Sequence, residues 1–291
     1  MTRTTTADRI FYFFLYLLMI VICFTMMYPF LYIISMFLGA SVIMRLSLIP
    51  PNPNLSSYTR VFQNIFILNG FKNTIFRVIL GTSLTLVTTI MTAYALSKKY
   101  FPNRSFWTGC LVFTMFFSGG LIPSYLLVRS LGLYNTIWAM VLPGLLSTYN
   151  MIIMRNFFMT IPGELEESAR IDGANDFRIL AQIIIPISGP IIATVALWTM
   201  VGHWNAWFDC MIYISSLSKQ VLQLILRRIV IEGTVQMMQF DNNPSYVDAG
   251  MNMPDSIKAA TIMVATVPIL MVYPFLQKYF VKGIMIGSLK G

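Results

Sequence analysis

Residues 10–38 read IFYFFLYLLMIVICFTMMYPFLYIISMFL, a run without one charged side chain. A helix needs about 20 apolar residues to cross a hydrocarbon core of roughly 30 Å, so this run is long enough. Of the 291 residues, 57% are hydrophobic and 11% are charged, whereas soluble domains carry about 25% charged residues. The sequence therefore predicts an integral membrane protein. The run is too long for a cleavable signal peptide and has no small-residue cleavage site, so we expect it to remain as a helix.

An all-α fold with six transmembrane helices is predicted, in a single domain over residues 1–291. The first helix is expected to break at Pro29, the third to weaken around Gly120 and Pro123, and the fifth to bend at Pro186. The predicted spans lie near residues 10–38, 74–96, 106–128, 133–154, 183–203 and 259–281.

The direction of the spans follows from basic residues in short loops, which stay on the cytoplasmic side. The connection between the third and fourth spans holds only Arg129, and the longer outer segments carry basic residues too. Both termini are therefore predicted to be cytoplasmic, as is the loop over residues 155–182. The residues that set this direction are Arg3, Arg9, Lys98, Lys99, Arg104, Lys278, Lys282 and Lys290.

Several kinds of chemistry have no motif in this chain. There is no G-x-x-x-x-G-K-[ST] loop to cradle the phosphates of ATP and no H-E-x-x-H zinc motif. One histidine and three cysteines give neither a zinc cluster nor a disulfide framework. The cysteines are interpreted as apolar packing residues, with Cys210 the most accessible of them from outside. The net charge of +9 is explained by orientation in the bilayer and not by nucleic acid.

The first four predicted spans contain no acidic residue, and Arg77, placed near the end of a span, is their one charge. A proton-driven carrier normally holds an ionisable group inside its helices. The energy for uphill transport is therefore expected to come from another chain. An ion-coupled secondary carrier stays open as an alternative because sodium sites can be built from backbone carbonyls. An intramembrane enzyme is a third hypothesis, although no nucleophile or metal constellation is visible.

Residues 162–176, PGELEESARIDGAND, hold five of the eleven acidic residues, and none occurs from Arg9 to Gly163. Proline suits a first helical turn, and acidic side chains complement the positive end of the helix dipole. Gly173 is predicted to end this short amphipathic helix with a positive φ, and Asn175 or Asp176 to cap the next helix. Leu165 and Ala169, one turn apart, are expected to share one face of this helix, with Ile161 a turn earlier. A solvated connector between two spans is the plain alternative.

The spacing Glu167-Ser168-Ala169, then Gly173, then Ile183-x-Ile185-Pro186 resembles the E-A-A-x(3)-G-x(9)-I-x-L-P signature. That signature marks the membrane permeases of binding-protein-dependent ABC importers, and it lies here in the last predicted cytoplasmic loop. Ser168 and Ile185 depart from it by small changes in size. Other stretches, among them FTMFFSGGLIPSYLLVRSLGLYNTIWAMVLPG and VGHWNAWFDCMIYI, are similar to the oligosaccharide branch of that family.

The resemblance implies a type I ABC importer permease fold in a bacterial cytoplasmic membrane, with no cofactor bound by this chain. It also implies a second homologous permease, two ATPase subunits that carry ATP and Mg, and an extracytoplasmic solute-binding protein. The cargo would be an oligosaccharide or polysaccharide, with alginate favoured. The acidic stretch would be the helix that couples to the ATPase, through Glu164, Glu166, Glu167, Ser168, Ala169, Asp172, Gly173 and Ala174.

Aromatic rings stack on the apolar face of a sugar, and amides bond its hydroxyls. Two stretches, STYN at 147–150 and GHWNAWFD at 202–209, combine such groups. An interfacial aromatic belt or hydrogen bonds between helices would explain them equally well. Within the outer segment 215–258, residues 220–233 (QVLQLILRRIVIEG) are interpreted as an amphipathic interfacial helix, and the basic residues Lys219, Arg227 and Arg228 face headgroups or an anionic sugar. The candidate channel residues are Tyr149, Asn150, His203, Trp204, Asn205, Trp207 and Asp209.

Overall fold

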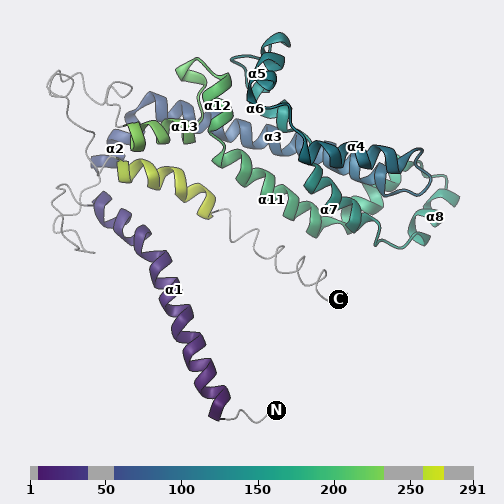
Figure 1. Ribbon diagram of the computed structural model, residues 1–291, viewed down its shortest axis with the longest axis horizontal. Helices are drawn as coiled ribbons and strands as arrows, with labels where there is room; N and C mark the ends of the chain where they lie inside the picture. Colours follow the sequence, from purple (N-terminus) through teal and green to yellow (C-terminus); the bar gives the residue numbers. More distant parts are fainter. Residues whose placement is uncertain (1–5, 39–55, 233–257, 272–291) are drawn as a thin grey trace. The chain divides into compact units, whose positions relative to one another are not determined.

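The computed structural model describes residues 6–38, 56–232 and 258–271, and every regular element within these ranges is helical (Figure 1). The chain divides into two units. One comprises residues 1–65 and 226–266, and the other comprises residues 66–225 and 267–291. The predictions that concern residues 233–257 and 272–281 fall outside the described residues.

The first unit contains α1 (Thr6–Leu38), α2 (Ser56–Gln63) and the short helix η4 (Arg228–Glu232). Helix α1 is continuous through Pro29, so the predicted break there is wrong. A proline removes one backbone donor, and a long apolar helix retains the rest of its hydrogen bonds. The side chains of α1 are exposed over residues 8–32, so this apolar surface is open to lipid or to another chain.

The second unit is built on α3 (Ile65–Ser97), with α4 (Arg104–Phe116), α7 (Thr148–Phe158) and α11 (Gly189–Asn205) alongside it (Figure 1). One cluster of buried side chains joins α3, α7 and α11 with the short helices α9 (Asp176–Ile179), η2 (Leu180–Ile184) and α10 (Ile185–Ile187). Ile90, Met154, Phe158, Ile184 and Val195 lie in this core. Close van der Waals packing of such side chains is what holds helices against one another in a membrane.

Two predicted interruptions are confirmed. Helix α4 and α5 (Leu121–Ser130) meet at 115°, and Gly120 between them has a φ of +85°. That conformation is open to glycine because it has no Cβ. The helices before and after Ser188 meet at 84°, beside Pro186 and Pro190.

The predicted span over 133–154 is not one continuous helix. It consists of α6 (Trp138–Val141), the 3-10 turn η1 (Leu142–Gly144) and then α7. Ser147 caps α7, its side chain accepting a hydrogen bond from the backbone N–H of Asn150 at 3.4 Å. The polar stretch at 147–150 therefore lies at the start of a helix and not within a continuous one. Pro143 and Gly144 were the signal for this break.

By length and composition, two of the described helices could cross a membrane, Asp8–Ile33 and Ile65–Ser97. The count becomes four if two bent pairs of helices each form one span. These pairs are α4 with α5, and the helices on either side of Ser188. The chain of the sixth predicted span is described only to Met271, as the apolar helix Lys258–Met271. The structure thus confirms a helical fold with apolar helices of membrane length.

The segment after α11 forms α12 (Phe208–Tyr213), η3 (Leu217–Lys219) and α13 (Leu222–Arg227). Cys210 is buried and accepts a hydrogen bond from the Val221 N–H at 3.4 Å, while Cys23 and Cys110 are exposed. The expectation that Cys210 is the most accessible thiol is therefore wrong. Leu222 and Leu224 are also fully buried, so α13 begins in the core of its unit and not as an interfacial helix.

Candidate functional site

The acidic stretch forms α8 (Glu164–Ile171), with three glutamates in its first turn. Gly173 follows with a φ of +80°, which confirms the predicted positive φ. The Asn175 side chain then accepts a hydrogen bond from the Arg178 N–H at 2.9 Å and so caps α9. In Figure 1, α8 lies at the end of the second unit where the chain turns from α3 into α4.

The two sides of this helix differ. Ala169 and Ala174 pack on the large core cluster of the second unit, together with Ile161. Leu165, predicted to share a face with Ala169, is 44% exposed, and Ile171 is 86% exposed. Phe177, just beyond the glycine turn, is 71% exposed. Sequence reasoning missed Ile171 and Phe177, and the signal it could have used is that both are large apolar residues in an otherwise polar stretch.

The acidic side chains have different surroundings. Glu164, Glu167 and Asp172 are exposed, as is Ser168. Glu166 forms an ion pair with Lys98, and the two side chains are 12% and 10% exposed respectively. The residues predicted to contact a partner therefore face two directions. Glu166 faces the end of α3, whereas the other acidic side chains of α8 face outward.

A second polar contact joins α8 to the loop after α3. One guanidinium nitrogen of Arg170 donates to Asp176 at 2.8 Å and also to the Tyr100 hydroxyl, which donates to Asp176 at 3.1 Å. The Arg170 guanidinium lies 4.7 Å from the centre of the Tyr100 ring. Partial burial raises the pKa of the Tyr100 phenol above its ordinary value, so the hydroxyl remains a donor at neutral pH.

The candidate channel residues do not form one cluster, and each has different neighbours. Tyr149 is exposed, and its ring centre lies 6.1 Å from that of Trp198 on α11. Asn150 is buried. Asn205 is exposed, and Trp207 is half-buried against the cluster that includes Cys210.

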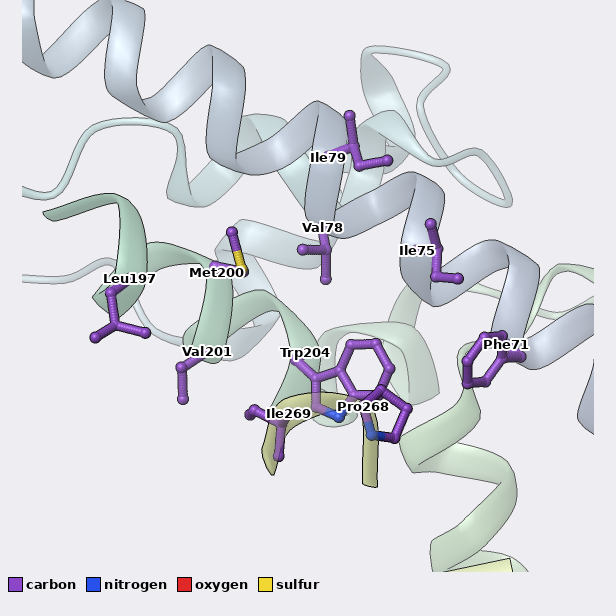
Figure 2. A pocket seen from close by; sticks show the side chains of 10 residues that line it. All are labelled: Phe71, Ile75, Val78, Ile79, Leu197, Met200, Val201, Trp204, Pro268 and Ile269. Atoms are coloured by element: carbon purple, nitrogen blue, oxygen red, sulfur yellow. The ribbon is translucent and has the colours of Figure 1, made fainter. Parts of the chain in front are cut away.

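Trp204 is buried, with its ring edge-to-face on Phe71 at 6.0 Å between ring centres. It lines an apolar cavity of about 250 Å³ between α3 and α11 (Figure 2). The hydroxyls of a sugar would find too few partners there, because burying an unpaired hydroxyl is unfavourable. His203, one residue earlier, lies with its ring against Gly81. The cavity lining consists of Phe71, Ile75, Val78, Ile79, Leu197, Met200, Val201, Trp204, Pro268 and Ile269.

Asp209 forms an ion pair with Arg77 on α3. The Arg77 side chain is 2% exposed and that of Asp209 is 29% exposed. Arg77 also donates to the backbone carbonyls of Ala206 at 3.2 Å and Met140 at 3.3 Å. Since α3 begins at Ile65, Arg77 lies well inside a helix, and its predicted position near an end is wrong. A charge inside a span usually has a partner, which was the signal for this pair.

The comparisons with known proteins agree with this fold. The family model for the inner membrane component of binding-protein-dependent transport systems matches residues 103–286. Protein LplC of Bacillus subtilis is 42% identical over 90% of this chain and 89% of its own length. YtcP of the same species, a polygalacturonan/rhamnogalacturonan transport permease, is 41% identical over 84% of each chain.

A crystal structure of a bacterial ABC transporter that imports the acidic polysaccharide alginate has a chain with a TM-score of 0.88. That chain is 31% identical, and the match covers 96% of this chain and all of that one. This protein belongs to the family of inner membrane components of binding-protein-dependent transport systems. It is a permease subunit of an ABC importer with the type I permease fold, and a separate subunit hydrolyses ATP.

Proposed function

We propose that this chain forms half of the translocation channel of an importer for acidic oligosaccharides or polysaccharides, alginate or its fragments first among them. A similar solved chain belongs to an alginate importer, and YtcP belongs to a system for polygalacturonan and rhamnogalacturonan. A second homologous permease completes the channel, two ATPase subunits hold ATP and Mg, and an extracytoplasmic binding protein delivers the sugar. The chain itself binds no cofactor.

The observation that carries this proposal is the exposed outer side of α8. It presents acidic side chains beside Ile171, which is 86% exposed. Protein interfaces typically combine an apolar core with a polar rim, and Ile171 among acidic side chains has this arrangement. The ATPase is therefore the partner that α8 contacts, and the coupling residues that face it are Glu164, Glu167, Ser168, Asp172 and Gly173. Glu166, Ala169 and Ala174 hold the helix from its inner side.

The topology is six spans with both termini in the cytoplasm, supported by the basic loop that follows α3. A cysteine that replaces Asn103, in a variant without the native cysteines, should react with a membrane-impermeant maleimide only in inverted vesicles. Ser218→Cys is the matched control, since Ser218 is exposed on the proposed outer side and should react in right-side-out cells. Reaction of the Asn103 variant in intact cells would overturn this orientation.

Sugar contact is assigned to the side chains around Tyr149 and Trp198, whose exposed rings offer a stacking surface. Asn150, Asn205, His203 and Trp207 remain candidates for the wall of the same channel. Asp209 forms an ion pair with Arg77, so we assign it a structural role in the channel wall. Trp204 lines the apolar cavity and contributes packing.

Uptake of labelled sugar into proteoliposomes tests the proposal. Vesicles that hold the two permeases and the ATPase subunits should accumulate alginate oligosaccharide only with ATP inside and loaded binding protein outside. Vesicles with this chain alone should show neither hydrolysis nor uptake. Uptake by this chain alone, driven by a proton or sodium gradient, would establish the ion-coupled carrier instead.

A further inference from the structure

We propose that Lys98 and Glu166 form a latch that transmits the movement of α8 to α3, so that both are positioning residues for coupled transport. The inference rests on the proposed function, in which α8 contacts the ATPase. It adds an intramolecular path from that contact to a long apolar helix of the second unit.

The first observation is where the ion pair lies. Lys98 directly follows Ser97, the last residue of α3, and Glu166 is in the first turn of α8. The Lys98 ammonium also lies 4.3 Å from the centre of the Tyr94 ring on α3. A cation at a helix C-terminus and an anion at a helix N-terminus are each favoured by the helix dipole. The pair therefore joins two helix ends whose dipoles suit its charges.

The second observation is burial. Both side chains are about nine-tenths covered, whereas exposed ion pairs contribute little because water and salt screen them. Glu167, the next residue, is exposed. The two adjacent glutamates therefore face opposite sides of α8. Glu166 forms an inward ion pair, and Glu167 lies on the exposed surface.

The third observation concerns the rest of the interface. Arg170, in the last turn of α8, is held by Tyr100 and Asp176. Polar contacts therefore fix both ends of α8 to the segment that ends α3. The apolar side chains that pack beneath the helix include Ala169 and Ala174, and an alanine buries little area. The orientation of α8 consequently depends on the polar contacts.

A third contact holds the same end of α3. The Arg155 side chain on α7 donates to the Leu96 carbonyl at 2.9 Å. This bond satisfies one of the carbonyls that the last turn of a helix leaves free. A shift of α8 would thus be passed through Lys98 to a helix end that is itself tied to α7.

The test uses the assembled transporter, with Lys98→Met as the variant. Methionine keeps a long apolar chain but loses the charge. We expect the ATPase subunits to co-purify as before, because the outer side of α8 is unchanged. Sugar taken up per ATP hydrolysed should fall about tenfold, within the usual range of coupling between sites. Lys99→Met is the matched control, since Lys99 is the exposed neighbour, and it should leave this ratio at the wild-type value.

Two further variants separate a latch from ordinary stabilisation. Lys98→Arg should restore most of the ratio, as should the exchange of Lys98→Glu with Glu166→Lys. A wild-type ratio for Lys98→Met, or no rescue by either variant, would overturn the latch. Failure of the wild-type chain to co-purify with any ATPase would instead overturn the proposed function. The two results can be distinguished because the uptake ratio of Lys98→Met is measured only in transporter that has assembled with the ATPase.

Discussion

Replacing Arg77 with methionine is expected to destabilise the chain by about 3–5 kcal/mol, the usual loss when one partner of a buried ion pair is removed. Arg77 is 2% exposed and holds Asp209 together with the carbonyls of Ala206 and Met140. Without the guanidinium, the Asp209 carboxylate, which is 29% exposed, and two backbone carbonyls lose a hydrogen-bond donor. The connection between α11 and α12 and the region around Met140 should loosen together.

Thermal unfolding of the purified chain in detergent measures this effect. Arg77→Lys should recover only part of the loss, because one ammonium cannot reproduce the several directed bonds of a guanidinium. The double variant Arg77→Met with Asp209→Leu should be more stable than Arg77→Met alone, since no unpaired charge remains. An unfolding temperature for Arg77→Met equal to wild type would show that the pair does not hold these elements together.

Features set by neighbouring residues could be predicted from the sequence. The uncharged run at 10–38 gave α1, and Gly120 gave the break before α5 because few other residues adopt its φ. The glycine turn after α8 and the Asn175 cap followed from equally local chemistry. These signals work because helix length, caps and turns depend on residues a few positions apart.

Contacts between distant residues could not be predicted in this way. Arg77 meets Asp209, and Lys98 meets Glu166, only after the helices pack. The same is true of Cys210, which was expected to be the most accessible cysteine but is buried in a cluster with Val221 and Leu224. The sequence showed which charges were unusual, and only the fold shows which of them are paired.

Gly173→Trp should abolish transport and strongly weaken ATPase association. Gly173 has a φ of +80°, where a residue with a Cβ is disfavoured by about 1 kcal/mol or more. No heavy atom lies within 4 Å of the position that a Cβ would take, so the chain itself leaves space for the new side chain. The ring would instead occupy the surface that we assign to the ATPase.

Two variants separate backbone strain from bulk. Gly173→Asn keeps a residue that tolerates positive φ and should retain most of the activity. Gly163→Ala changes the glycine at the other end of α8, where φ is −65° and the space around a Cβ is equally open. It should behave as wild type.

The most direct measurement is the amount of ATPase subunit that co-purifies with this chain from membranes, compared between wild type and Gly173→Trp. We predict a stable complex for wild type and Gly163→Ala, and a loss of about tenfold or more for Gly173→Trp at equal membrane insertion. Equal recovery of the ATPase with Gly173→Trp, with sugar-stimulated hydrolysis intact, would show that α8 is only a connector between two helices.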